Sequence, residues 1–162
     1  HTDNRRQRQM CIRDRLEISE VVFPDGGSSR PPNMTFLGPP GTGKTTMARL
    51  MGKTLQKLGS LNGGAFVEAS KQDLIGPYSN QVGMCVKKCV ERAKGGVLLI
   101  DDVHALAESD GDLGREAINA LVPLISDNED VLFIIAGHEK QMKTFFAAHG
   151  AHHSLRRMTR TG

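Results

Sequence analysis

The segment that most constrains the fold is a glycine-rich stretch that satisfies the pattern G-x-x-x-x-G-K-[ST] in full. Its residues are Gly38, Pro39, Pro40, Gly41, Thr42, Gly43, Lys44 and Thr45, and a second threonine, Thr46, follows. Glycines at these spacings let the backbone turn tightly and point successive N–H groups at an anion. The pattern predicts a loop that binds the phosphates of ATP, in which Lys44 reaches the β- and γ-phosphates and the Thr45 hydroxyl binds Mg²⁺.

The sequence on both sides of this loop supports the prediction. Met34–Leu37 is a short apolar run typical of a strand, and it stands directly before the loop. From Lys44 to Leu58 apolar residues recur close to every 3.6 residues, and Gly59 then occupies the place of a helix cap. Strand, glycine loop and amphipathic helix in this order favour nucleotide binding over a glycine-rich turn with no ligand.

A second informative segment runs from Gly95 to Asp102. Its apolar residues, from Val97 to Ile100, do not alternate with polar ones, which predicts a parallel strand buried on both faces. Two acids follow at the carboxyl end, where ligands bind in open α/β sheets. We therefore predict that Asp101 holds Mg²⁺ opposite Thr45, and that Asp102 orients and deprotonates the attacking water.

Strands and helices alternate along the rest of the chain. We expect strands near 34–37, 65–68, 97–100 and 131–136, and helices near 44–58, 81–94, 113–126 and 139–148. This order predicts an α/β fold with a doubly wound parallel sheet. The predicted organisation is a tail and linker over 1–33, poorly ordered, an ATPase core over 34–150, and a polar basic tail over 151–162.

Composition narrows the possible partners and compartments. The net charge is +3, but residues 34–150 carry 12 Lys and Arg against 13 Asp and Glu, so the core offers no basic surface for nucleic acid. No apolar run approaches the roughly 18 residues of a membrane span. Cys11, Cys85 and Cys89 fit neither a disulfide framework nor a zinc pattern. We expect no nucleic-acid or membrane partner, and a reducing compartment, the cytoplasm or an organelle interior, not secretion.

Taken together, residues 34–146 resemble the AAA+ ATPases. Within them the chain is similar to the group that includes the CbbX type of Rubisco activase, the sporulation stage V protein K type and the ATPases of type VII secretion. The segments that carry the resemblance are Gly38–Thr46, Asp73–Tyr78, Gly95–Asp102, Glu116–Ile118 and Ile134–His138. The resemblance implies a homo-hexameric ring that hydrolyses ATP to remodel a protein partner, which an aromatic pore loop grips.

The resemblance also implies roles for two single residues. Tyr78 falls on the pore-loop aromatic that binds the partner; the alternative is an ordinary half-buried tyrosine. His138 falls at the sensor-1 position, where a polar side chain helps to position the attacking water; the alternative is a solvated loop histidine. The group usually carries tyrosine at this position. The candidate catalytic residues are thus Asp102, Lys44 and His138.

The chain departs from the family pattern in several places. Asp102 replaces the usual catalytic glutamate and is one methylene shorter. Arg156 and Arg157 are the candidates for the family's arginine finger, and a polar tail explains His149, His152 and His153 better than metal binding does. The family's fifth strand and helical lid have no counterpart before Gly162, so we expect a fragment of a longer protein.

Two alternative functions stay open at the level of sequence. One is a nucleotide-binding regulator that holds ATP with little or no hydrolysis, which Asp102 and the missing lid favour. The other is a different P-loop protein, such as a small-molecule kinase or a DNA-acting loader. A kinase normally needs an arginine-rich lid and an acceptor site, and a loader needs a basic core surface; the sequence indicates neither.

Overall fold

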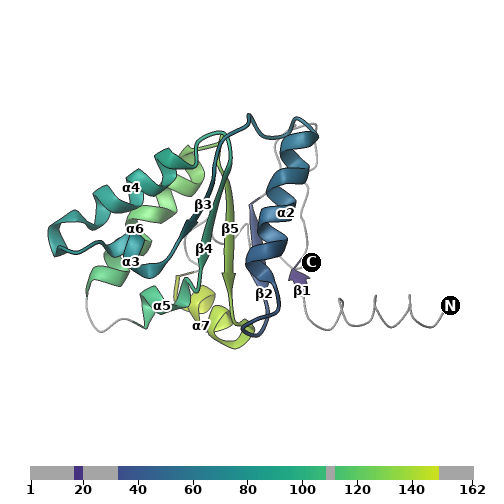
Figure 1. Cartoon of the computed structure of the whole chain (residues 1–162). Helices are drawn as coiled ribbons and strands as arrows, with labels where there is room; N and C mark the ends of the chain where they lie inside the picture. Colours follow the sequence, from purple (N-terminus) through teal and green to yellow (C-terminus); the bar gives the residue numbers. More distant parts are fainter. Residues whose placement is uncertain (1–16, 20–32, 109–111, 150–162) are drawn as a thin grey trace, which may run out of the picture.

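A five-stranded sheet organises the part of the chain that the computed structural model describes, residues 17–19, 33–108 and 112–149 (Figure 1). Its strand order is β1-β2-β5-β4-β3. The strands are β1 (Glu17–Ser19), β2 (Met34–Leu37), β3 (Phe66–Ala69), β4 (Val97–Asp101) and β5 (Leu132–Gly137). Strands β2, β5, β4 and β3 pair in parallel, which confirms the predicted α/β fold, and β3 begins one residue later than expected.

The remaining strand, β1, was not predicted. It lies inside the segment that the sequence suggested to be a tail and linker, and it pairs antiparallel with β2, so that Glu17 stands opposite Leu37. A strand of three residues is too short to show a period in the sequence, and its backbone partner lies far along the chain. The strand β1 therefore forms because it pairs with the edge of β2, and the local sequence does not indicate this.

In the part of the chain that the structure describes, one face of the sheet is covered by helix α2 (Lys44–Lys57) (Figure 1). The apolar side chains between this helix and the strands form a core of their own. Its fully buried members are Met34, Phe36, Ala48, Val97, Leu99, Leu132, Ile134 and Ala136. The helix comes close to β4 at Gly52, where an added Cβ would lie 2.9 Å from Cγ2 of Val97. A glycine in mid-helix thus permits the close packing.

The other face is covered by all the later helices, and Figure 1 shows α3, α4 and α6 together on that side. These helices are α3 (Lys71–Ile75), the 3₁₀ turn η1 (Ser79–Gln81), α4 (Val82–Arg92), α5 (His104–Ala107), α6 (Asp112–Asp127) and α7 (Glu139–His149). The long helices confirm the predictions with bounds that differ by at most two residues. The short helices α3 and α5 were not predicted, because helices of four or five residues carry too little periodicity.

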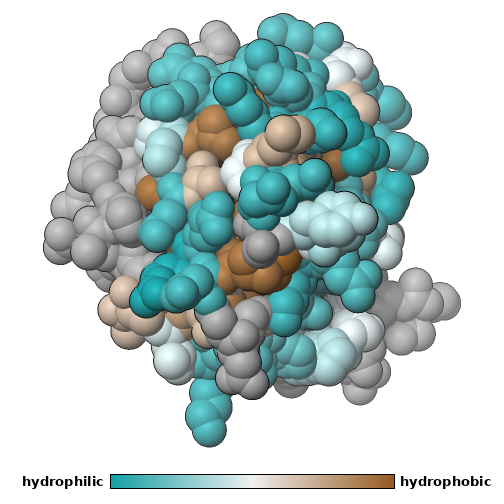
Figure 2. Space-filling model, turned by 90° about the vertical axis from the view of Figure 1, so that its left-hand side faces the viewer, coloured by the Kyte–Doolittle hydropathy of each residue, from teal (hydrophilic) through white to brown (hydrophobic). Residues whose placement is uncertain are grey.

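The outer surface of this helical layer is mostly hydrophilic, with hydrophobic groups in separate patches (Figure 2). Beneath it, the larger core joins the helices to the strand residues that point away from α2. The strand residues of this core are Val67, Ala69, Leu98, Ile100, Phe133 and Ile135. Because both cores contain alternate residues of β4 and β5, these two strands are buried on both faces, as their unbroken apolar sequences predicted. None of the described helices is long and apolar enough to cross a membrane.

The connections define where a ligand can bind. After β2 the chain passes to α2 on one face, whereas after the neighbouring strand β5 it passes to α7, whose Met142 and Phe145 belong to the core of the opposite face. Two adjacent parallel strands whose connections leave on opposite faces open a crevice at their carboxyl ends. The glycine loop occupies this position.

Candidate nucleotide-binding site

The glycine loop leads from β2 into α2 with two residues in the left-handed backbone region. Gly41 has φ 73° and Gly43 has φ 86°, values that glycine adopts at little cost. A Cβ added to either would meet nothing within 4 Å, so space is open on that side of the loop. The loop is also tied to the sheet, because the Gly38 amide donates to the Gly137 carbonyl at the end of β5 (3.1 Å).

Helix α2 begins directly after the loop, and no side chain caps its first turn. Gly43 occupies the N-cap position without a side-chain hydrogen bond, and the first turn contains no acid. The free N–H groups and the positive end of the helix dipole are therefore available to an anion. Helix α3 shows the contrast: Ser70 and Asp73 form a complete capping box at its start.

Lys44 is the buried cation of the site, with 7% of its surface exposed. Its Nζ donates to the carbonyls of Gly38 and Pro39, each at 3.0 Å, and the Thr42 hydroxyl donates to the same Pro39 carbonyl at 2.8 Å. An ammonium group carries three donors, so one is left for a phosphate oxygen. These bonds hold the lysine against its own loop.

The two acids lie at the same edge of the sheet as the loop. Register places Leu37 beside Gly137 and Asp101 beside Ala136, so the ends of β2, β5 and β4 are level. Two strand spacings, about 10 Å, separate the backbones of β2 and β4. A nucleoside triphosphate with Mg²⁺ would fit such a gap, with the glycine loop available to hold its phosphates and the Asp101 carboxylate to hold its metal.

Asp101 and Asp102 differ in their surroundings. Asp101 is half-buried, and its Oδ1 accepts a hydrogen bond from the Asp102 amide (2.9 Å), which orients the carboxylate. Asp102 is exposed and has φ 50°, the left-handed region that aspartate tolerates better than most side chains. Its carbonyl accepts from the Ala105 amide at the start of α5 (2.8 Å). The Asp101 carboxylate and the hydroxyl of Thr45, which is half-buried at the start of α2, are oxygen ligands of the kind that Mg²⁺ prefers.

Two histidines meet beside these acids, and the sequence indicated only one of them. His138 follows β5, is half-buried, and its carbonyl accepts from the Met142 amide. His104 opens α5, is 7% exposed, and its Nδ1 is buried without a hydrogen-bond partner in the described part of the chain. Leaving such a nitrogen unpaired costs about 1–3 kcal/mol. The available signal was a histidine two residues after Asp102, which by itself does not indicate burial.

Tyr78 lies in the segment between α3 and α4, after strand β3 in the chain. It is 65% exposed, so it is not the half-buried tyrosine of the alternative interpretation. Gly76, two residues earlier, has φ 72°, and a Cβ there would lie 2.6 Å from Sγ of Cys85. The segment that presents Tyr78 therefore rests closely on α4. The binding role of Tyr78 stays a prediction.

Helix α3, which leads into this segment, is fixed at its start by the Asp73 carboxylate. Its Oδ2 accepts from the Ser70 hydroxyl (2.6 Å) and the Ser70 amide (2.8 Å). These two hydrogen bonds lower the pKa of Asp73 from its ordinary value of 3.8, and the bond from the Ser70 hydroxyl has the larger effect. Behind α3, burial and the neighbouring Asp73 charge raise the pKa of the Cys89 thiol, which favours its neutral form.

Several predicted residues fall outside the described structure. Arg156, Arg157, His152 and His153 lie outside the described ranges, and the side chain of His149 does too. Among the described residues no group of three or more His, Cys, Asp or Glu could hold a metal ion.

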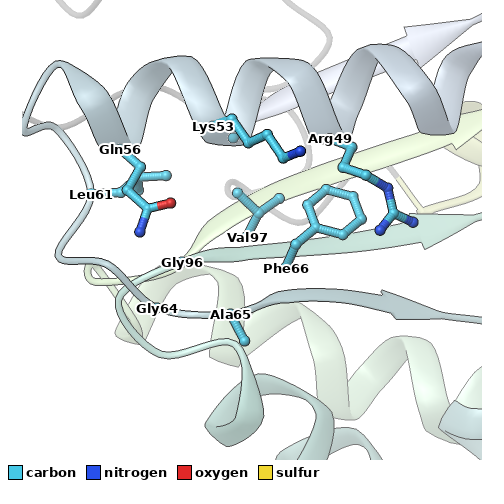
Figure 3. Close-up of a pocket in the computed structure, with 10 residues that line it drawn as sticks. Arg49, Lys53, Gln56, Leu61, Gly64, Ala65, Phe66, Gly96 and Val97 are labelled. Carbon is cyan, nitrogen blue, oxygen red and sulfur yellow. The ribbon is translucent and has the colours of Figure 1, made fainter.

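A cavity of about 210 Å³ lies at the other end of α2, between this helix and the beginnings of β3 and β4 (Figure 3). Arg49 and Lys53 extend from α2 over a floor that includes Phe66 and Val97. The Arg49 guanidinium lies 4.7 Å from the centre of the Phe66 ring and pairs with Glu68 at 3.4 Å. No residue of the glycine loop lines this cavity, so it is distinct from the nucleotide-binding site.

Together the glycine loop, the uncapped helix and the acids across β5 define a P-loop nucleotide-binding domain. The model of the "ATPase family associated with various cellular activities (AAA)" matches residues 34–150, and the chain belongs to this family. The predicted resemblance is confirmed.

Two relatives support the group within the family. The chain is 41% identical over 118 residues to "Protein cbbX homolog, chloroplastic" of Guillardia theta, which covers 71% of this chain and 32% of the relative. It is 39% identical over 148 residues to "Ribulose bisphosphate carboxylase/oxygenase activase, chloroplastic" of Cyanidioschyzon merolae, covering 84% and 48% respectively. The chain thus spans less than half the length of these relatives.

A solved structure supports the fold alone. The "FIGL-1 AAA domain in complex with ADP" aligns with a TM-score of 0.50 over 65% of this chain and 36% of that chain, at 19% sequence identity.

Proposed function

We propose that this chain is the ATP-binding and ATP-hydrolysing part of an AAA ATPase that remodels a protein partner. The observation that carries the proposal is the position of the uncapped α2 start and the Asp101–Asp102 turn on either side of the β5 end. One side offers N–H groups and a cation for phosphate, and the other offers carboxylates for Mg²⁺ and water. These are the groups that phosphoryl transfer to water requires.

Each group has a role in this proposal. The amides from Gly38 to Thr46 bind the phosphates, and Lys44 turns its remaining donor towards the γ-phosphate. Thr45 and Asp101 hold Mg²⁺, which neutralises charge on the β- and γ-phosphates when it is bound with ATP. Asp102 accepts the proton of the attacking water, and His138 helps to orient that water.

The remodelling part of the proposal depends on Tyr78. Its exposure supports a side chain that contacts a partner, and a relative of this chain is named an activase. We propose that six copies of the full-length protein form a ring with Tyr78 in the central pore. The partner is a protein, because residues 34–150 carry no excess of positive charge for nucleic acid. The two free thiols Cys85 and Cys89 suit a reducing compartment inside the cell.

The test is Tyr78→Ala in the full-length protein. We expect ATP binding to be unchanged and remodelling to be lost, because Tyr78 belongs to the segment between α3 and α4 and not to the glycine loop. Met84→Ala is the matched control, since Met84 is a similarly exposed apolar side chain (56%) on the adjacent helix α4 and has no place in the proposal. Intact remodelling in Tyr78→Ala, or equal loss in both variants, would contradict the pore role.

A second candidate function is a regulator that binds ATP and hydrolyses little of it. The exposed, left-handed position of Asp102 together with its short side chain favours this candidate. Single-turnover hydrolysis by the wild-type protein at saturating ATP and Mg²⁺ separates the two. ATP that stays bound and intact over hours supports the regulator, and ADP formed within minutes supports the ATPase.

A further inference from the structure

His104 is a buried polar residue to which neither the sequence motifs nor the proposed function assigns a role. It stands at the first position of α5, two residues after Asp102, and its Nδ1 has no hydrogen-bond partner among the described residues. Buried imidazoles normally satisfy both ring nitrogens, because desolvating one without a partner is unfavourable. The unpaired nitrogen therefore needs an explanation in the surroundings of the ring.

Those surroundings are the end of β5. The rings of His104 and His138 make an edge-to-face contact, with centroids 5.6 Å apart and planes at 84°. Gly137 makes room for this contact, since a Cβ there would lie 3.1 Å from Nδ1 of His104 and 2.7 Å from Sδ of Met142. His104 is thus packed against the strand end that carries His138, and a side chain at residue 137 would disturb that packing.

His104 is also connected to the acids through the backbone. The turn after β4 closes when the Ala105 amide donates to the Asp102 carbonyl, and the buried Val103 lies between Asp102 and His104. The backbone of His104 is therefore part of the turn that presents Asp102. The His104 ring touches His138, at the end of β5, and the His104 backbone belongs to the turn after Asp102.

We propose that His104 is a positioning residue: its buried Nδ1, beside the His138 ring, fixes the orientation of the His138 imidazole and couples that loop to the Asp102 turn. The inference rests on the proposed ATPase function. A hydrogen bond between this Nδ1 and a ring nitrogen of His138 would hold the His138 imidazole in place when ATP is bound. A metal site is the weaker explanation, because two histidines lack a third ligand among the described residues.

The experiment is a double-mutant cycle in the full-length protein, with His104→Phe, His138→Ala and the double variant. We expect each single variant to slow single-turnover hydrolysis roughly tenfold with unchanged ATP affinity, and the double variant to be no slower than the slower single one. Phenylalanine keeps the ring and its packing but removes both nitrogens. Losses that multiply in the double variant, or an unchanged rate in His104→Phe, would overturn the inference.

Two further variants separate positioning from simple packing. His104→Asn retains a polar group close to the Nδ1 position, and we expect it to recover most of the rate. Leu106→Val perturbs another buried residue of α5 that the His104–His138 contact does not include, and it should lower the melting temperature without slowing hydrolysis. A rate that follows the melting temperature across all variants would mean that His104 is only a packing residue.

A measurement that needs no hydrolysis protects the test against variants that fail to fold. In histidine-labelled full-length protein, His104→Asn should shift the His138 ring resonances, because the neighbouring ring is removed. Unshifted resonances would overturn the contact itself. If the contact is present but the wild-type protein hydrolyses no ATP, the proposed function fails and the positioning role with it. If the wild type hydrolyses ATP and the losses multiply, this inference alone fails.

Discussion

Helix α2 carries positively charged side chains near both edges of the sheet. These side chains differ in how many hydrogen-bond and ion-pair partners they have. At the carboxyl edge of the sheet, the helix start has no cap, and Lys44 donates only to two carbonyls of its own loop. At the amino edge, Arg49 has both an acid, Glu68, and an aromatic face, Phe66 (Figure 3). Hydrogen-bond donors are thus left unused at the start of α2, whereas the arginine at the amino edge is paired.

This difference shows that a cavity is a poor guide to the site in this fold. The cavity at the amino edge has about 210 Å³ of space, but its walls are the apolar floor of the α2 core and a paired arginine. The crevice at the carboxyl edge is defined by the uncapped backbone N–H groups of α2 and by carboxylate oxygens that can bind a cation. Unsatisfied polar groups therefore distinguish the two ends better than volume does.

The largest expected effect separates two lysines of the same helix. We predict that Lys44→Ala weakens ATP binding by roughly 10- to 150-fold, because a charge-assisted contact of about 1.5–3 kcal/mol is lost. Lys53→Ala, the matched control at the cavity, should leave ATP affinity unchanged. Equilibrium titration with a fluorescent ATP analogue measures both. Equal losses in the two variants would mean that general positive charge, and not the glycine loop, binds the nucleotide.

The difference between the two ends also explains what the sequence could predict. The glycine loop and the run from Val97 to Asp102 are local patterns with a single physical meaning each, so the parallel strands, α2 and the crevice followed from them. The strand β1 and the helix α5 depend on pairing and packing with distant residues. The burial of His104 could not be predicted for the same reason, since it depends on contact with His138, 34 residues later in the chain.

The second prediction concerns hydrolysis at the carboxyl edge. We expect Asp102→Glu to hydrolyse ATP faster by about a hundredfold in single turnover, because the added methylene moves the carboxylate towards the water by about 1 Å. ATP affinity should stay the same, since the loop amides and Lys44 are untouched. Glutamate tolerates φ 50° less well than aspartate, so the variant should also be slightly less stable. A wild-type rate equal to that of the variant would show that aspartate reaches the water already.

The third prediction tests the close packing of the middle of α2 on β4. In Gly52→Ala, the new Cβ lies 2.9 Å from Cγ2 of Val97, a stiff side chain in a buried strand. The overpacking costs about 1–3 kcal/mol, and the better helix propensity of alanine offsets about 1 kcal/mol of it. The free energy of unfolding should therefore fall by up to about 2 kcal/mol in denaturant titration.

Gly83→Ala is the matched control for that variant. Gly83 is also helical, in α4, but a Cβ there meets nothing within 4 Å. Alanine should therefore raise the free energy of unfolding, by at most about 1 kcal/mol. A gain in both variants would mean that α2 can move away from β4 without cost, and that the α2 core is less tightly packed than the structure indicates.

The smallest expected effect concerns helix α3. Its first turn has a complete capping box, whereas the first turn of α2 has no side-chain cap. The pKa of Asp73 is lowered in the folded protein from its ordinary 3.8, chiefly by the hydrogen bond from the Ser70 hydroxyl. The carboxylate therefore stabilises the fold fully above pH 3.8, and this contribution disappears as the pH falls through the lowered value. Because Asp73 is exposed, we expect the contribution to be below about 1 kcal/mol.

The measurement is the melting temperature of the wild type and Asp73→Asn from pH 6 down to pH 3. The wild type should be more stable than Asp73→Asn at pH 6. The difference should shrink below pH 3.8, because protonation then removes the Asp73 charge from the wild type as well. In a Ser70→Ala background the main donor is gone, so Asp73→Asn should have less effect at every pH. A difference that is constant with pH, or equally large without the Ser70 hydroxyl, would mean that the carboxylate charge at Asp73 does not stabilise α3. The contrast between an open start in α2 and a satisfied start in α3 would then have no energetic basis.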